Sequence, residues 1–484
     1  MASRDIEQGR NVAIVSVAGN SDLMQETGHA TQQADHKISK WGAIKENPIN
    51  FLWCVYGIWA LIVIGFDNQA GGLVVSIPEF RKDYGKAFKG GYVIDAQWQS
   101  AFSGGPVASS VIGSLAAGYF GDLIGRRWTI TAGLSFTFVG VALEFSSDTV
   151  QVFFAGKFIN GLALGILTTM VLTWVSEVSP LVLRGLMTGL CNVSFCIGPF
   201  VAVLIENSVA TKTNKWAYRA LFVSQWGFGI TSVLIAPFMP ESPWWLIGKD
   251  RDDALKQLRR TNLRRTIITI MPLTIQAMSG VAYISSYGTY YFQLAGISTA
   301  RSFQIACGAQ ALSIAGNIGA FLIIDRVGRR PLVLWVFWLS DVTVGLTVFY
   351  NFAYNFAIGA VAYAIIAETA TSRLRAKSIA ISSTIQAALF TMWQFVLPYI
   401  FNPNEGNLGA RTSFIFGGLS VLCWIYLYFY QPETARRSFE ETDEMFLKHV
   451  PARKFKGFKT DTEQMGEDAL RSKTEILHVE VKAE

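Results

Sequence analysis

The amino-acid sequence predicts an all-α membrane protein made of two six-helix halves. Of its 484 residues, 51% are hydrophobic and only 16% are charged, whereas a soluble globular protein of ordinary composition carries about 25% charged residues. The mean hydropathy is positive, at +0.33. Three charged sequence signatures also occur twice, in the same order along the chain. These observations exclude an ordinary soluble multidomain protein and favour a membrane bundle with an internal repeat.

Twelve apolar stretches predict the spanning helices, because a helix needs about 20 mainly apolar residues to cross a bilayer. The ninth stretch is too short to cross a hydrocarbon core about 30 Å thick without help. The stretches lie at residues 51–78, 98–121, 128–145, 152–178, 183–204, 218–239, 267–294, 302–324, 331–340, 344–368, 378–401 and 412–430.

Lysine and arginine gather in alternate loops, which predicts that these loops and both termini are cytoplasmic. The polar start of the chain lacks the pattern of a secretory signal, so we expect the first span to stay in the protein. The predicted units are a disordered cytoplasmic tail over 1–46, an N-terminal half over 47–240, a cytoplasmic linker with a short helix over 241–266, a C-terminal half over 267–430, and a cytoplasmic tail over 431–484.

The polar residues within the predicted spans do not suggest an enzyme, a metal centre or a cofactor site. All four histidines lie in the polar terminal stretches, and the five cysteines lie in apolar runs without CxxC spacing. No nucleophile–base pair is evident among the spans. The net charge of +6 comes from basic loops that topology explains, so a nucleic-acid partner is not expected.

The repeat is carried by three signatures: Asp-x-x-Gly-Arg-Arg, Glu followed seven positions later by Arg, and Pro-Glu-Ser/Thr. The first two signatures lie 55 positions apart in the first half and 43 in the second, so twelve residues are missing where the ninth span should be. The signatures begin at Asp122 and Asp325, at Glu177 and Glu368, and at Pro240 and Pro432, respectively.

The signatures resemble those of the sugar porter branch of the major facilitator superfamily, from the first span to about residue 456. The segment between Pro240 and the seventh span is shorter than the helical cytoplasmic domain usual in that family. The further elements that match the sugar porter branch are Gly65-Phe66-Asp67, Ser176-Glu177, Pro240-Glu241-Ser242-Pro243-Trp244-Trp245 and Pro432-Glu433-Thr434. Within that branch, Leu374-Arg375-Ala376-Lys377 and the tail Ser438-Phe439-Glu440-Glu441 look most like fungal maltose and general α-glucoside permeases.

The resemblance implies the major facilitator fold and a function in secondary active transport. It implies import of a sugar, either maltose or another α-glucoside, together with a proton by alternating access. The expected partners are the sugar, the proton and the lipid bilayer, and the expected state is a monomer in the plasma membrane. A sugar receptor that does not transport, and a hexose facilitator that is independent of protons, remain alternatives on the same fold.

Asp67 is the charged residue that most needs an explanation, because an aspartate in a span costs about 2.5–3.5 kcal/mol on insertion scales. It lies about 24 Å above Phe51 along the first span, and Lys157 in the fourth span falls at a similar height. The pair matches the proton-coupling pair of the family. The alternative is that Asp67 caps a broken helix while Lys157 extends to the interface.

Sugar binding requires amides and hydroxyls near the midplane together with an aromatic face. Asn192 and Gln276 lie at that depth on the fifth and seventh spans, and the resemblance implies that these two positions contact the sugar. Tyr363 occupies a position where sugar porters place an aromatic residue. For all three residues, hydrogen bonding or packing between helices is the alternative.

The duplicated charged residues lie at helix ends, where they can exchange partners, and they predict a cytoplasmic gate. The resemblance implies that each glutamate meets the arginines of the Asp-x-x-Gly-Arg-Arg loop when the inner face is closed. Permanent anchoring of basic loops would account for the arginines but not for the two glutamates. The predicted gate consists of Asp122, Arg126, Arg127, Glu177, Arg184, Asp325, Arg329, Arg330, Glu368 and Arg375.

Overall fold

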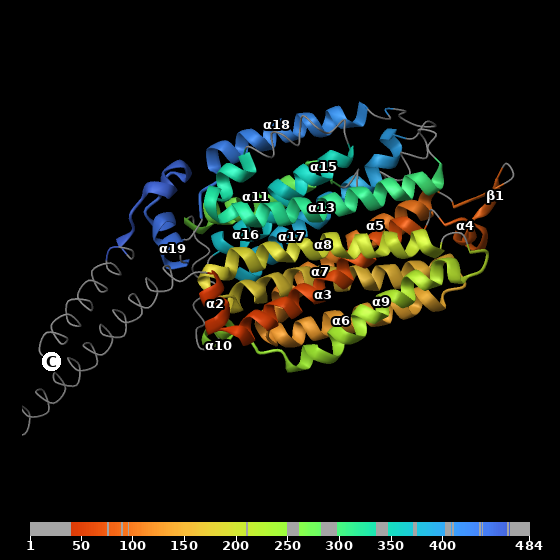
Figure 1. The fold of residues 1–484 in the computed structure, drawn as a ribbon, viewed down its shortest axis with the longest axis horizontal. Helices are drawn as coiled ribbons and strands as arrows, with labels where there is room; N and C mark the ends of the chain where they lie inside the picture. Colours follow the sequence, from red (N-terminus) through yellow and green to blue (C-terminus); the bar gives the residue numbers. More distant parts are fainter. Residues whose placement is uncertain are drawn as a thin grey trace, which may run out of the picture.

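The computed structural model of the chain (Figure 1) is almost entirely helical. It describes residues 40–74, 77–88, 91–94, 96–209, 212–248, 261–281, 298–334, 347–370, 375–401, 408, 411–434, 437, 439–461 and 464.

The first half contains six long helices, one for each of the six spans predicted there. Each observed helix extends a few residues beyond the apolar stretch on at least one side, because polar residues continue the helix into the interface. The helices are α3 (Pro48–Val74), α5 (Ala96–Leu123), α6 (Arg126–Ser146), α7 (Val150–Val178), α8 (Leu181–Val209) and α9 (Trp216–Ile235).

Short elements join these helices. The helix α2 (Lys40–Glu46) lies within the segment predicted as a disordered tail, and residues 1–39 of that segment lie outside the described residues. Between α3 and α5 the chain forms α4 (Pro78–Tyr84) and a small antiparallel hairpin, β1 (Lys86–Phe88) with β2 (Gly91–Val93), in which Lys86 pairs with Val93. A 3-10 turn, η1 (Ala236–Phe238), and α10 (Pro243–Gly248) follow α9.

The second half contains α11 (Thr261–Met278), α13 (Thr299–Val327), α17 (Arg375–Phe401) and α18 (Thr412–Tyr430). The tenth span is one helix with a π turn in its middle, formed by α15 (Thr347–Tyr354), η3 (Asn355–Gly359) and α16 (Ala360–Thr369). The elements α19 (Phe439–Leu447) and η5 (Ala452–Gly457) follow α18.

Three predictions reach segments that the structure does not describe. Residues 329–334 are helical, but residues 335–346 lie outside the described part, so the shortened ninth span stays a prediction. Residues 249–260 of the predicted linker and residues 282–294, the outer part of the seventh span, also lie outside it.

The chain is a multi-pass membrane protein. Seven of the described helices are long and apolar enough to cross a bilayer. Large apolar side chains on their outer surfaces are exposed, among them Leu204, Phe414 and Leu422, as lipid-facing positions require. The seven helices are α3, α6, α7, α8 (from residue 183), α9 with η1, α17 (to residue 397) and α18.

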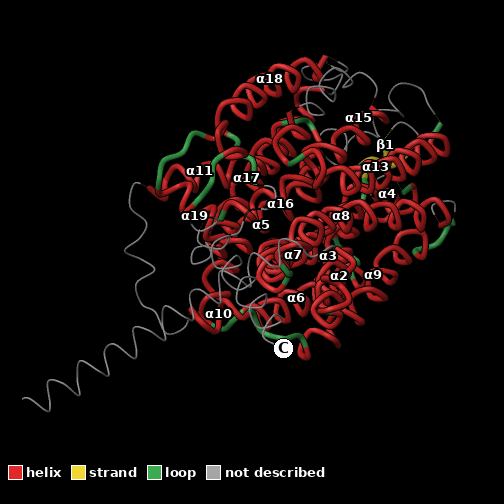
Figure 2. Tube along the Cα trace, turned by 60° about the vertical axis from the view of Figure 1, so that its left-hand side comes forward, coloured by secondary structure: helices red, strands yellow, loops and turns green. Residues whose placement is uncertain are grey.

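The two halves lie side by side and meet along two pairs of helices. In each pair, one helix of the first half packs along one of the second: α5 along α17, and α8 along α13. Figure 2 shows these helices in the middle of the bundle, with α6 and α9 on one side and α18 on the other.

Glycines allow α5 and α7 to pack with their backbones in near contact. A Cβ atom on Gly161 would lie 2.1 Å from the backbone oxygen of Pro106, and one on Gly165 would lie 2.1 Å from that of Ser110. Small residues at such crossings are typical of helix packing in lipid, where close backbone approach supplies the attraction.

We predict that Gly161→Ala lowers the stability of the purified protein by about 1–3 kcal/mol, because the added methyl group overpacks the α5–α7 contact. Thermal unfolding in detergent measures the change. Gly227→Ala on α9 is the matched control, since a Cβ there meets nothing within 4 Å and alanine favours the helix by up to about 1 kcal/mol. Equal melting temperatures for the two variants would contradict the predicted close packing.

Candidate functional site

A cavity of about 220 Å³ lies between the two halves of the bundle. Its wall includes residues of α3, α5, α7 and α8 from the first half and of α11, α13, α15, η3, α16 and α17 from the second. All five residues predicted for proton coupling or sugar binding lie on this one wall: Asp67, Lys157, Asn192, Gln276 and Tyr363.

Asp67 and Lys157 form a buried ion pair at the cavity. The Lys157 Nζ donates to Asp67 Oδ1 at 2.7 Å, and both side chains are at least 95% buried. Lys157 Nζ also lies 3.0 Å from Glu144 Oε2. The amide of Asn160 joins the two carboxylates, donating to Asp67 Oδ1 at 3.0 Å and to Glu144 Oε1 at 2.9 Å. We call these four residues the buried ion cluster.

Glu144 is a member of the cluster that the sequence prediction missed. It lies at the end of its apolar stretch, where the sequence alone does not distinguish a buried carboxylate from one at the interface. The structure buries it completely, because α6 and α7 cross closely at Gly140 and Gly156. With every group ionised, the cluster holds two carboxylates and one ammonium, a net charge of −1.

Asn192 forms hydrogen bonds with helices of the other half. Its Nδ2 donates to Asn317 Oδ1 on α13 at 2.8 Å and to Asn355 Oδ1 on η3 at 3.2 Å. Asn317 Nδ2 in turn donates to Asn355 Oδ1 and to Cys196 Sγ. The helix-to-helix hydrogen bonding given as the alternative for Asn192 therefore occurs, at a position that also lines the cavity.

Gln276 forms hydrogen bonds to the backbone of the π turn in the tenth span. Its Nε2 donates to the backbone oxygens of Ile358 and Gly359, at 3.1 and 3.2 Å, carbonyls at the end of the π turn η3. Its Oε1 accepts from Gln386 Nε2 at 2.7 Å. Tyr363 stacks on Phe195 of the first half, with ring centroids 5.9 Å apart and an interplanar angle of 16°.

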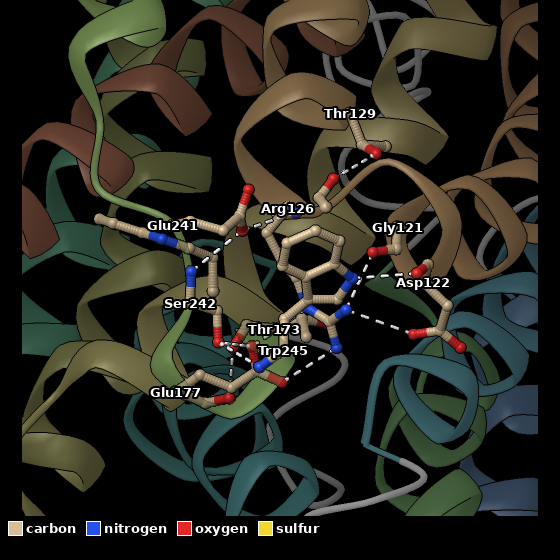
Figure 3. A network of polar contacts seen from close by, with 12 residues as sticks. Gly121, Asp122, Arg126, Thr129, Thr173, Glu177, Glu241, Ser242 and Trp245 are labelled. Atoms are coloured by element: carbon tan, nitrogen blue, oxygen red, sulfur yellow. Dashed lines mark hydrogen bonds and ion pairs between the residues drawn. The ribbon is translucent and has the colours of Figure 1, made fainter. Parts of the chain in front are cut away.

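The charged signatures of the first half form a compact polar network, shown in Figure 3. Both carboxylate oxygens of Glu177 accept from the guanidinium of Arg126, at 3.1 and 3.2 Å. The same guanidinium donates to the Gly121 backbone oxygen at 2.9 Å and to Asp122 at 3.3 Å. The Ser242 hydroxyl donates to Glu177. Arg126 thus holds the end of α5, the start of α6 and the end of α7 together.

Glu241 also belongs to this network and binds the amino end of α6. Its carboxylate accepts the backbone N–H groups of Arg126, at 2.8 Å, and of Arg127, as expected of an anion at a helix N-terminus. Gly125, at φ +93°, makes the approach possible, because a Cβ there would lie 2.4 Å from Glu241 Oε2. The glycine of the signature is therefore required by both backbone conformation and space.

The second half repeats the same arrangement. Four contacts of the first network have counterparts of the same kind, so the sequence repeat is also a structural one. The counterparts are Glu368 with Arg329 Nη2 at 2.9 Å, the Thr434 hydroxyl with Glu368 at 2.6 Å, Glu433 with the N–H groups of Arg329 and Arg330 at 3.0 and 3.1 Å, and Gly328, at φ +95°, against Glu433.

Two predicted gate residues, Asp122 and Arg375, make contacts across the two halves. Each glutamate–arginine pair, in contrast, lies within its own half. Lys377 Nζ lies 3.4 Å from Asp122 Oδ2. The guanidinium of Arg375 lies 5.9 Å from the ring centre of Trp244. Arg184, also buried, donates from Nε to the Ser176 backbone oxygen at 3.1 Å. The Asp325 side chain lies outside the described residues.

A membrane bundle of two repeated halves around a polar cavity defines a transporter of the major facilitator fold. The family model described as "Sugar (and other) transporter" matches residues 53–258, 253–340 and 336–446. The chain therefore belongs to the sugar transporter family, whose members are transporters rather than enzymes.

Known relatives and solved structures agree with this family. The chain is 26% identical over 516 residues to the general alpha-glucoside permease of Saccharomyces cerevisiae and 26% identical over 514 residues to a maltose permease of the same yeast. Each alignment covers 91% of this chain and 83% of the relative. The fold is similar to that of the proton:xylose symporter XylE bound to 6-bromo-6-deoxy-D-glucose, with a TM-score of 0.71, 15% identity, and coverage of 83% of this chain and 99% of that one. For XylE from E. coli in an inward-open conformation the TM-score is 0.61, with 16% identity and coverage of 81% and 99%.

We predict that Lys157→Met destabilises the protein by about 3–5 kcal/mol, because it leaves two buried carboxylates without their cation. Adding Glu144→Gln to this variant should restore part of the loss, since one of the two uncompensated charges is removed. Thermal unfolding of the single and double variants measures both changes. A double variant less stable than Lys157→Met would contradict the charge balance assigned to the cluster.

Proposed function

We propose that this protein imports a sugar, maltose or another α-glucoside, together with a proton, by alternating access. The observation that carries the proposal is the Asp67–Lys157 ion pair on the wall of the cavity that also holds Asn192, Gln276 and Tyr363. A titratable pair and a set of amides in one compartment allow proton binding and sugar binding to influence each other. The names of the yeast relatives support the sugar class.

In this mechanism, a proton from outside binds to the Asp67 carboxylate. The resulting neutral carboxyl group no longer attracts the Lys157 ammonium as an ion, while Glu144 still holds that ammonium. The cluster then carries no net charge, which favours burial when the cavity closes around the sugar. Opening of the inner face returns water to the cavity, and the proton leaves Asp67 for the cytoplasm.

The two cytoplasmic networks act as the inner gate. In the described arrangement, Arg126 and Arg329 are held by Glu177 and Glu368. Loss of these contacts frees the helix ends that they join, and their recovery restores the closed face. Such exchange of partners gives the two discrete packings of the halves that alternating access requires.

The remaining assignments concern orientation, location and oligomeric state. We assign both termini to the cytoplasm, because the Lys- and Arg-rich loops lie on one side. We also assign the protein to the plasma membrane, as a monomer. Residues 47–240 and 267–430 are the two halves, joined by the linker over 241–266.

We predict that Asp67→Asn abolishes uphill maltose uptake driven by an inward proton gradient, because the asparagine amide does not bind and release a proton as the aspartate carboxylate does. Exchange of labelled for unlabelled maltose should persist. Proteoliposomes measure both processes. Asp148→Asn is the matched control, because the Asp148 side chain is 72% exposed and pairs only with the exposed Lys215 and the partly exposed Arg219 among the described residues.

Two outcomes would count against the proposal. Asp67→Asn vesicles that still concentrate maltose would remove Asp67 from the coupling step. Wild-type vesicles that bind maltose but neither take it up nor exchange it would favour a receptor that does not transport.

A further inference from the structure

Two helices of the second half carry a series of polar and aromatic residues along the cavity wall. The residues on each helix are spaced three or four positions apart, so each set shares one helix face. On α17 the cavity-lining residues include Ser383, Gln386, Phe390 and Gln394, and on α13 they are Gln310 and Ser313, with Asn317 one turn further along.

The amides of these helices fall into two tiers. The inner tier is bonded to the predicted sugar-binding residues: Gln386 to Gln276 at 2.7 Å, and Asn317 to Asn192 at 2.8 Å. The outer tier consists of two further glutamines, Gln310 on α13 and Gln394 on α17. The helices α13 and α17 are the eighth and eleventh spans and run in opposite directions. A position earlier on α13 and a position later on α17 are therefore both nearer the outer side. Gln394 lies about 12 Å beyond Gln386, and Gln310 about 10 Å beyond Asn317.

The inner end of the cavity presents hydroxyl groups without partners. Ser383 Oγ and Thr168 Oγ1 are buried and have no hydrogen-bond partner among the described residues. Both residues line the cavity, one from each half. Buried hydroxyls are normally satisfied, so these two favour a ligand that brings its own hydroxyl groups to this end.

We propose that Gln310 and Gln394, with the ring of Phe390, form an outer subsite for the second pyranose ring of an α-linked disaccharide. The inner tier, closed below by Thr168 and Ser383, binds the first ring. A single pyranose in the inner tier does not reach amides about 10–12 Å away, whereas a disaccharide does. The outer subsite therefore determines selectivity for disaccharides over monosaccharides, and this inference rests on the proposed transport function.

The test is the double variant Gln310→Leu/Gln394→Leu in proteoliposomes. Loss of the outer hydrogen bonds should raise the KM for maltose by about tenfold or more, while the exchange of labelled glucose stays at the wild-type rate. Gln225→Leu is the matched control, because this buried amide on α9 does not line the cavity. Its maltose KM should match that of the wild type.

If the double variant does not fold, as judged by size-exclusion chromatography, Gln310→Asn/Gln394→Asn tests the same subsite by shortening each amide by one methylene. An unchanged maltose KM, or an equal loss for glucose and maltose, overturns the outer subsite. A wild type that exchanges glucose but not maltose overturns the subsite and leaves sugar transport standing. A wild type that moves neither sugar overturns the transport proposal itself.

Discussion

The structure depends on the pairing of charged side chains that are buried within the membrane-spanning helices. A charged side chain in a span is tolerated only when it meets a partner or a wet cavity, and Asp67 has both: the Lys157 ammonium at 2.7 Å and the central cavity. Four residues on α3, α6 and α7 converge to meet this requirement. The cluster joins three helices of the first half, and two of its members, Asp67 and Lys157, line the cavity between the halves.

The signature networks meet a different requirement, which is to hold several helix ends in one arrangement. In each half a signature glycine with positive φ lets a glutamate reach the amino end of a helix. A buried arginine then pairs with the glutamate of the Glu-x6-Arg signature. The two halves place glycine, arginine and glutamate at matching positions in these contacts, with Ser242 in the first half and Thr434 in the second as the hydroxyl donor.

Much of the fold follows from the sequence, because uniform apolar stretches mark the spans and charged signatures mark their cytoplasmic ends. The meeting of Asp67 and Lys157 also follows from counting helical rise from those ends. Glu144 was missed because it lies where an apolar stretch ends, and Asn317, Asn355 and Gln386 because amides within spans leave no periodic signal. The π turn at 355–359 has no local sequence mark either; the hydrogen bonds of Gln276 to its carbonyls depend on the tertiary arrangement.

The central claim is that sugar moves through this cavity together with a proton handled by the buried ion cluster. Solid-supported membrane electrophysiology tests it directly, because a neutral sugar carries charge only when an ion moves with it. The account predicts that a maltose jump produces an inward positive current that is absent in Asp67→Asn. Maltose transport by the wild-type protein without any current would contradict it.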